Sequence, residues 1–333
     1  MAVAAEPAAL PVEPSPAEVR ELARDFNLVP LRHTFIDDCE TPVSAFLKLR
    51  GAQPDSPAFL LESAEKGQRV GRYSFIGMHP RAVVRWSLGD EGDPYAIADR
   101  EVGRYRQAPL GDLPPFAGGA VGFFGYDLVR TVEPLGEPNP DVLGLPDMAL
   151  MLSDVLVVFD HLKHTITIVA NVFAEDEDVD RAYAAALATI AAARRRLAGP
   201  VPAVAPTPAR PAPLFTSNMP RERFEAMVAR IVEYVHAGDA FQVVPSQRWS
   251  APLEGVDPFS IYRGLRVVNP SPYMYFLDFG DFEIAGASPE PLLKVTGRRV
   301  ETRPIAGTYP RGGSDEEDRR RAEQLLEDPK ERA

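Results

Sequence analysis

The stretch YMYFLDFGDFEIAG, residues 273–286, indicates the fold class of this chain. Apolar residues of the β-forming type fill two runs, 273–279 and 282–286, and the triplet Asp278-Phe279-Gly280 marks a tight turn where the first run ends. Two such runs joined by so short a turn are typical of an antiparallel hairpin. Two shorter runs, 292–296 and 300–303, follow after further short turns. This part of the chain therefore predicts an antiparallel meander.

Strands and helices alternate irregularly on either side of this meander. The sequence predicts strands at 58–61, 72–76, 82–86, 120–124, 150–172 (folded back at residues 160–163) and 241–249. It predicts helices at 176–197, from an Asn218 cap to Gly238, and at 314–326, each with apolar periodicity, charge order or capping residues suited to a helix. We therefore expect an α+β fold with mostly antiparallel sheets.

The proline-rich stretch AGPVPAVAPTPARPAP, residues 198–213, divides the chain. Its alternating prolines forbid a helix and favour an extended linker. We therefore predict a flexible N-terminal segment at 1–28, a first domain at 29–197, the linker at 198–213 and a second domain at 214–333.

Composition excludes several functional classes. The formal net charge is -12, which argues against a surface that follows nucleic-acid phosphates. The single cysteine, Cys39, excludes an internal disulfide framework and suits a reducing cytoplasm. The N-terminus lacks the basic start and the continuous apolar core of a signal peptide, and no apolar run is long enough to span a membrane.

Two patterns look functional but are better explained by structure. His161 and His164 lie at a strand turn without the further ligands that a closed metal site needs. Gly119, Gly122 and Gly125 miss the spacing of a dinucleotide-binding loop, and close backbone packing explains them better.

Five motifs in a fixed order are informative about the chemistry: LLES at 60–63, AGDAFQVVPSQR at 237–248, NPSPYM at 269–274, IAGASPE at 284–290 and RPIAGT at 303–308. Together they resemble the chorismate-utilising enzymes, and among them the anthranilate synthase component I group, from residue 29 to residue 333. The resemblance implies a sandwich of two large antiparallel sheets enclosing helices, with the second sheet incomplete here. It also implies a regulatory first domain and a chorismate-binding second domain.

The resemblance assigns roles to residues of the second domain. Glu290 matches the family's general acid, which protonates the leaving C4 hydroxyl of chorismate, and Gly307 and Thr308 match residues that bind the substrate. Ala306 stands where aminodeoxychorismate synthases carry a nucleophilic lysine, and Gln242 stands where isochorismate synthases carry a lysine that activates water. Neither Ala306 nor Gln242 can do that chemistry. Both residues therefore point to direct addition of ammonia at C2, which is anthranilate synthesis.

The same resemblance predicts an effector site for L-tryptophan. It comprises Glu62 and Ser63 from one motif and Pro272, Tyr273 and Met274 from another, with Arg72 and Ser74 as candidate partners of the ligand carboxylate. An amino acid ligand needs an acceptor for its ammonium group, donors for its carboxylate and an apolar slot for its indole.

The family further implies Mg²⁺ and a glutamine amidotransferase subunit that supplies ammonia. We expect the Mg²⁺ ligands to lie beyond Ala333, so that this chain is a truncated member and is inactive by itself. The alternatives are an aminodeoxychorismate synthase component I, which Ala306 disfavours, and a non-catalytic tryptophan-binding protein if the chain ends at Ala333. A longer reading frame would exclude the second alternative.

Overall fold

A computed structural model describes residues 10–51, 55–63, 71–174, 178–203, 213–305 and 309–329. The chain forms two compact units. One contains residues 1–202 together with 262–333, and the other contains residues 203–261. The predicted division into a regulatory and a catalytic domain stays a prediction.

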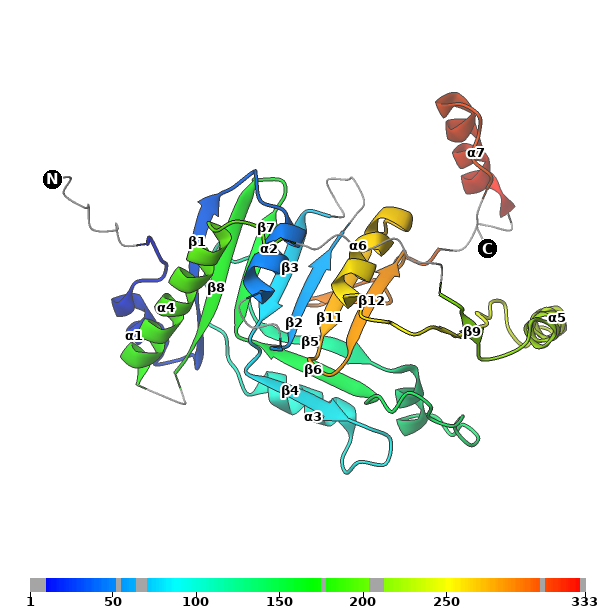
Figure 1. The fold of residues 1–333 in the computed structure, drawn as a ribbon, viewed down its shortest axis with the longest axis horizontal. Coiled ribbons are helices and arrows are strands. Elements are labelled where there is room, and N and C mark those ends of the chain that lie inside the picture. The colour runs from blue at the N-terminus through cyan, green and yellow to red at the C-terminus, as the bar shows by residue number, and fades with distance from the viewer. Residues whose placement is uncertain are drawn as a thin grey trace. The chain divides into compact units, whose positions relative to one another are not determined.

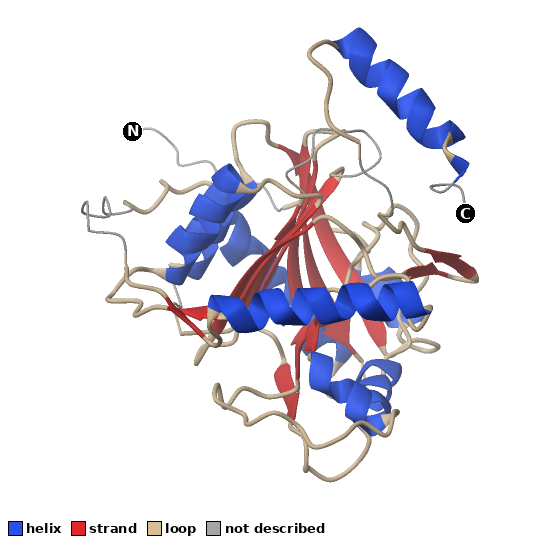
Figure 2. Ribbon diagram, turned by 90° about the vertical axis from the view of Figure 1, so that its right-hand side faces the viewer, coloured by secondary structure: helices blue, strands red, loops and turns tan. Residues whose placement is uncertain are grey.

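A seven-stranded antiparallel sheet forms the centre of the larger unit (Figure 1). The hairpin predicted at 273–286 is confirmed as the last two strands. In spatial order the sheet contains β1 (Leu28–Ile36), β8 (Thr165–Phe173), β7 (Val155–Asp160), β3 (Tyr73–Met78), β2 (Ala58–Glu62), β11 (Tyr273–Asp278) and β12 (Glu283–Ser288). The strands twist progressively across the sheet (Figure 2).

A three-stranded antiparallel sheet packs on this large sheet. Its order is β4 (Ala82–Trp86), β6 (Met148–Ser153) and β5 (Gly119–Phe124). The run at 150–172, which we predicted to fold back once, contains three strands, because the chain also turns at Asp154 and sends β6 into this second sheet. The α+β class is confirmed, with one large antiparallel sheet and smaller additional sheets.

Alternation along β11 shows how the layers meet. Leu277 packs in a core cluster with Ala149 and Met151 of the small sheet. Its neighbour Phe276 points to the opposite face and meets Phe46 edge to face at 5.8 Å between ring centroids. Because Phe46 lies on α2 (Pro42–Arg50), one face of the large sheet is covered by helices and the other by the second sheet.

Close packing against neighbouring backbone, which we predicted for three glycines, is confirmed for Gly122 in β5 and for Gly125 just after it, whereas a Cβ atom on Gly119 would lie nearest to a Phe116 side-chain atom, at 3.3 Å. A Cβ atom on Gly122 would lie 1.9 Å from the Ala149 carbonyl oxygen, and one on Gly125 would lie 2.9 Å from the Asp147 carbonyl oxygen. Any larger residue would collide with the backbone of the chain beside it.

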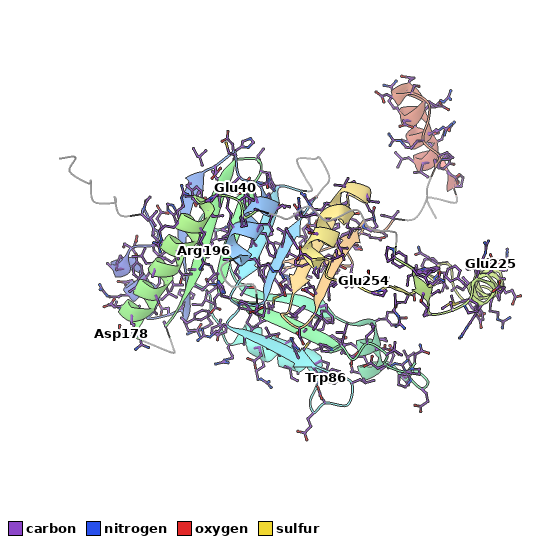
Figure 3. All side chains as sticks on the ribbon, viewed as in Figure 1. Glu40, Trp86, Asp178, Arg196, Glu225 and Glu254 are labelled. Carbon is purple, nitrogen blue, oxygen red and sulfur yellow. The ribbon has the colours of Figure 1, made fainter. Side chains whose placement is uncertain are left out.

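The helix predicted at 176–197 is α4 (Val179–Leu197), which packs on β8 and β1. Asp178 caps its first turn, and Arg196 lies in its last turn, at the opposite end in Figure 3. These charges match the helix dipole. The remaining elements are α1 (Pro16–Leu22), α3 (Pro94–Gly103), η1 (Tyr126–Thr131), β9 (Thr216–Ser217), α5 (Arg221–Ala237), β10 (Trp249–Ser250), α6 (Pro258–Val268), β13 (Lys294–Thr296), β14 (Arg299–Glu301) and α7 (Asp315–Glu327).

Three local expectations differ from the structure. The strand predicted at 241–249 is reduced to β10, because its only partner among the described residues is the two-residue β9. Asn218 does not cap α5, since its Oδ1 accepts a hydrogen bond from the Arg248 backbone N–H at 3.0 Å. Within the N-terminal segment for which we expected flexibility, residues 16–22 form α1, with Ser15 as N-cap and Val19 fully buried.

Candidate functional site

Glu290 lies just beyond the end of β12, where Pro289 leads the chain out of the large sheet. Its side chain is exposed, and Oε1 accepts a hydrogen bond from the backbone N–H of Ile305 at 3.1 Å. The Ser288 hydroxyl donates to the Glu290 carbonyl at 3.0 Å and so fixes the turn. The candidate acid is therefore held against the loop of the RPIAGT motif.

The other candidate substrate residues lie either outside the described residues or in the smaller unit. Ala306, Gly307 and Thr308 lie outside the described residues, immediately after Ile305. Gln242 is exposed and belongs to the smaller unit. Their roles stay predictions.

The predicted effector residues, in contrast, converge on one cavity of about 740 Å³ in the larger unit. Six of the seven line it: Glu62, Ser63, Arg72, Pro272, Tyr273 and Met274. A volume of this size suits a small-molecule ligand. The structure thus brings together two motifs that lie about two hundred residues apart in the sequence.

Strand pairing explains this convergence. β11 lies beside β2 in the large sheet, and Met274 is paired directly with Glu62. Ser63 follows the end of β2, and Pro272 and Tyr273 lie at the start of β11. Both motifs therefore lie at the same end of the sheet.

Glu62 has protein partners of its own. Its side chain is 3% exposed; Oε1 accepts the Tyr262 hydroxyl at 2.6 Å, and Oε2 accepts Arg266 Nη2 at 3.0 Å. Burial, reinforced by the Glu62 charge, raises the pKa of Tyr262, so that the phenol remains a donor. Tyr262 and Arg266 are one turn apart on α6, and Glu62 therefore fastens β2 to that helix.

Arg72 and Ser74 differ from each other in position. Arg72 lines the cavity and makes a two-point ion pair with Asp160, at 3.1 and 2.8 Å, which lowers the pKa of that carboxyl. Ser74 is buried, forms a 2.8 Å hydrogen bond with His161 Nε2 and is not part of the cavity lining. Burial lowers the pKa of His161, which indicates a neutral structural imidazole.

Sequence reasoning missed two basic residues of the cavity wall. Lys294 on β13 and Arg303, shortly after β14, line it together with Glu301. Their strands were predicted, but nothing local in the sequence shows that this hairpin faces β2. The Pro115-Phe116 wall was missed for the same reason.

No group of three or more His, Cys, Asp or Glu residues suited to a metal ion occurs in the described ranges. The described residues therefore offer no cluster of three or more protein ligands for Mg²⁺. Among the same residues, no helix is long and apolar enough to cross a bilayer.

Comparisons with known proteins agree with the fold. A sequence model of the chorismate binding enzymes matches residues 56–333. The chain is 46% identical over 312 residues to anthranilate synthase component 1 of Thermus thermophilus, covering 91% of this chain and 64% of that relative. It is 42% identical over 332 residues to the protein of the same name from Pseudomonas putida, covering 94% of this chain and 66% of that relative.

Solved structures give the same result. The crystal structure of anthranilate synthase component I from Streptococcus pneumoniae matches with a TM-score of 0.62 at 30% identity, covering 89% of this chain and 64% of that one. The menaquinone-specific isochorismate synthase of Escherichia coli shares the fold at a TM-score of 0.52 and 13% identity. The chain spans just under two thirds of the length of the first two curated relatives, at 64% and 66%. The predicted resemblance is confirmed, and the chain belongs to the chorismate binding enzyme family.

Proposed function

We propose that this chain is the synthase component of an anthranilate synthase, a lyase that converts chorismate and ammonia to anthranilate, pyruvate and water at the first step of tryptophan biosynthesis. The names of relatives that are 46% and 42% identical support this activity. The structural observation that best supports Glu290 as the acid is its hydrogen bond from the backbone N–H of Ile305. This bond holds the carboxyl group beside Ile305, which Ala306 follows directly in the sequence.

In the proposed reaction ammonia forms a bond to C2 of the ring, and the C4 hydroxyl leaves as water after protonation by Glu290. Loss of the enolpyruvyl group as pyruvate, with a ring proton, then gives the aromatic amine. Ala306 offers no side-chain nucleophile, and Gln242 offers no base, so ammonia itself is the attacking group. Gly307 and Thr308 are the proposed substrate-binding pair.

The proposed co-reactants follow from the same assignment. A glutamine amidotransferase subunit supplies the ammonia, and the reducing cytoplasm suits the single, exposed Cys39. Mg²⁺ remains the expected cofactor, although the described residues contain no cluster of three or more His, Cys, Asp or Glu residues suited to hold it.

We also propose that the 740 Å³ cavity binds L-tryptophan as a feedback inhibitor. Three cationic side chains, Arg72, Lys294 and Arg303, surround it as candidate partners for the ligand carboxylate. Glu62 and Ser63, from the LLES motif, provide oxygen acceptors for the ligand ammonium group. Pro272 and Met274, from the NPSPYM motif, provide apolar contacts for the indole ring.

The test uses the protein expressed from its complete reading frame, with chorismate, ammonium and Mg²⁺. We expect anthranilate, followed by its fluorescence, and pyruvate in equal amounts. Accumulation of aminodeoxychorismate without pyruvate would favour the alternative synthase. Tryptophan binding without any turnover would favour the non-catalytic alternative.

A further inference from the structure

The cavity of about 740 Å³ has an apolar, largely aromatic floor on one face of the large sheet. Tyr275 of β11 is paired directly with Leu61 of β2, and Leu61 is paired with Phe75 of β3. The three side chains therefore form one row across the sheet, because directly paired residues lie on the same face. Tyr73 lies two residues before Phe75 and shares this face. All four line the cavity and pack against the core cluster that contains Leu277.

Phe116 adds an aromatic wall from a different part of the fold. It lies between α3 and β5, in the segment that leads into the three-stranded sheet, and it lines the same cavity. Its ring meets the Phe75 ring edge to face, with 6.0 Å between the centroids and 81° between the planes. Two aromatic rings attract each other in this arrangement. The floor and the wall therefore meet at the pair formed by Phe75 and Phe116.

The backbone on either side holds Phe116 in place. Two prolines precede it and restrict the chain. Ala117 follows it and is buried, and the Ala117 carbonyl accepts a hydrogen bond from Asn171 Nδ2 at 3.1 Å. Gly119 has a φ of 129°, and a Cβ atom there would lie 3.3 Å from a Phe116 ring carbon, so a glycine leaves room for the ring. These contacts fix the Phe116 ring beside the cavity.

The two phenylalanine rings offer a ligand more than apolar area. An apolar lining attracts any apolar side chain that fits, because burial of apolar surface is non-directional. Two aromatic rings attract each other more specifically, because each ring has a negative face and a positive edge. A saturated ring cannot receive this contribution, which corresponds to roughly a two- to tenfold gain in affinity.

We propose that Phe75 and Phe116 form the surface that receives the indole ring, and that they give the cavity its preference for an aromatic ligand. This role rests on the proposed tryptophan site and names the residues that determine its specificity. The Tyr73 ring lies beside this surface, 6.2 Å from the Phe75 ring between centroids, and the Arg72 guanidinium lies 4.8 Å from the Tyr73 centroid. The candidate partner of the ligand carboxylate therefore lies next to the aromatic surface.

Calorimetric titration of the complete protein with L-tryptophan and with L-cyclohexylalanine tests this role. The two ligands share the α-amino acid group, and the second has a saturated ring. Phe116→Leu keeps an apolar side chain in the wall and removes its ring, whereas Phe116→Tyr keeps the ring. We expect the preference of the wild type for tryptophan to fall at least about threefold in Phe116→Leu and to persist in Phe116→Tyr. A purely structural role of Phe116 would weaken the binding of both ligands equally and leave the preference unchanged.

Phe123→Leu is the matched control. Phe123 is half-buried, packs against the same core cluster and meets Phe279 edge to face at 5.8 Å, but it is not part of the cavity lining. This variant should keep the wild-type preference, and an equal loss of preference in it would overturn the proposal. A wild type that binds tryptophan no more tightly than L-cyclohexylalanine, or a preference unchanged in Phe116→Leu, overturns the proposal and leaves the tryptophan site standing. A wild type that binds no tryptophan overturns both.

Discussion

At Glu290 the proposed chemistry depends on one exposed carboxyl group held by the backbone of Ile305. Glu290→Gln keeps the shape of the side chain and removes its acidic proton. General acid catalysis contributes about 10² to 10⁴ in rate, so turnover by the complete enzyme should fall by that factor while chorismate binding persists. Steady-state rates and a binding titration check this. Glu91→Gln, at an exposed turn, is the matched control; a loss of less than about threefold in the Glu290 variant would exclude Glu290 as the acid.

Asp154 should make stability depend on pH. Its pKa is raised from 3.8 to about 6 in the folded chain, mainly by burial, so the folded state binds the proton more tightly than the unfolded state. The stabilising contribution of the protonated carboxyl is present below about pH 4 and is lost as the pH rises through about 6. Because the group is partly exposed, we expect Asp154→Asn to raise the free energy of unfolding by only about 1–2 kcal/mol at pH 8.

Urea unfolding of the wild type and of Asp154→Asn at pH 4 and pH 8 measures this difference. The two proteins should be equally stable at pH 4. A gap that is the same at both pH values would show that the carboxyl does not titrate in this window.

Single residues also show what the sequence could predict about the site. The motif resemblance predicted an effector role for Glu62, and the structure places Glu62 in the lining of the 740 Å³ cavity. Its hydrogen bonds to Tyr262 and Arg266 were not predictable, because both partners lie about two hundred residues away and neither belongs to a recognised motif. Local sequence indicates a residue type and its place on a strand, but not the partner that tertiary packing supplies.

At the scale of elements, strands with complete pairing were predicted well. The 273–286 hairpin was recognisable because a turn separates two apolar runs that pair with each other. The 241–249 run also contains several apolar residues, but within it only Trp249 takes part in strand pairing. Whether a run forms a paired strand depends on the neighbouring strand that the fold places beside it. The β propensity of the run itself gives no information about that neighbour.

The contact between β2 and α6 should contribute measurably to stability. Tyr262→Phe removes the hydroxyl that donates to Glu62 at 2.6 Å in a buried site. A hydrogen bond to a charged group contributes about 1.5–3 kcal/mol, and we expect the free energy of unfolding to fall by roughly 2 kcal/mol in urea titrations. Tyr126→Phe, at a tyrosine that is 90% exposed, should change it by less than about 0.5 kcal/mol. Equal small effects in both variants would contradict the proposed fastening of β2 to α6.

The pairing of β5 with β6 leaves no room for a Cβ atom at Gly122. Alanine there would approach the Ala149 carbonyl oxygen to 1.9 Å, and backbone on the facing strand cannot move aside as a side chain can. We expect Gly122→Ala to lower the free energy of unfolding by about 2–3 kcal/mol or more. Gly103→Ala, at the end of α3 with nothing within 4 Å of the added atom, should be neutral or stabilising by up to about 1 kcal/mol. Thermal melting of both variants distinguishes steric overlap from a general intolerance of alanine.

At the scale of the whole molecule, the 740 Å³ cavity and the candidate acid Glu290 share a chain segment. Pro291, Leu292 and Leu293 line the cavity and directly follow Glu290, and Arg303 lines it two residues before Ile305, the partner of Glu290. A ligand that shifts either segment would therefore act on the contact between Glu290 and Ile305. This adjacency depends on β11 lying beside β2, a pairing that neither motif reveals in the sequence.

Ser63→Phe tests whether the cavity controls the chemistry. Ser63 follows β2 and lines the cavity, so a phenyl group there would occupy space that the proposed tryptophan needs. We expect the tryptophan concentration for half-maximal inhibition of the complete enzyme to rise at least about tenfold, which corresponds to roughly 1.4 kcal/mol. Inhibition requires tryptophan to favour one conformation of the segments around Glu290, and loss of binding removes that preference. Ser250→Phe, at an exposed serine of β10, is the matched control. An inhibition curve for Ser63→Phe that overlies the wild-type curve would remove Ser63 from the proposed effector site. A shifted inhibition curve with unchanged tryptophan binding in calorimetry would show that Ser63 affects the coupling between the two sites and not the binding of tryptophan.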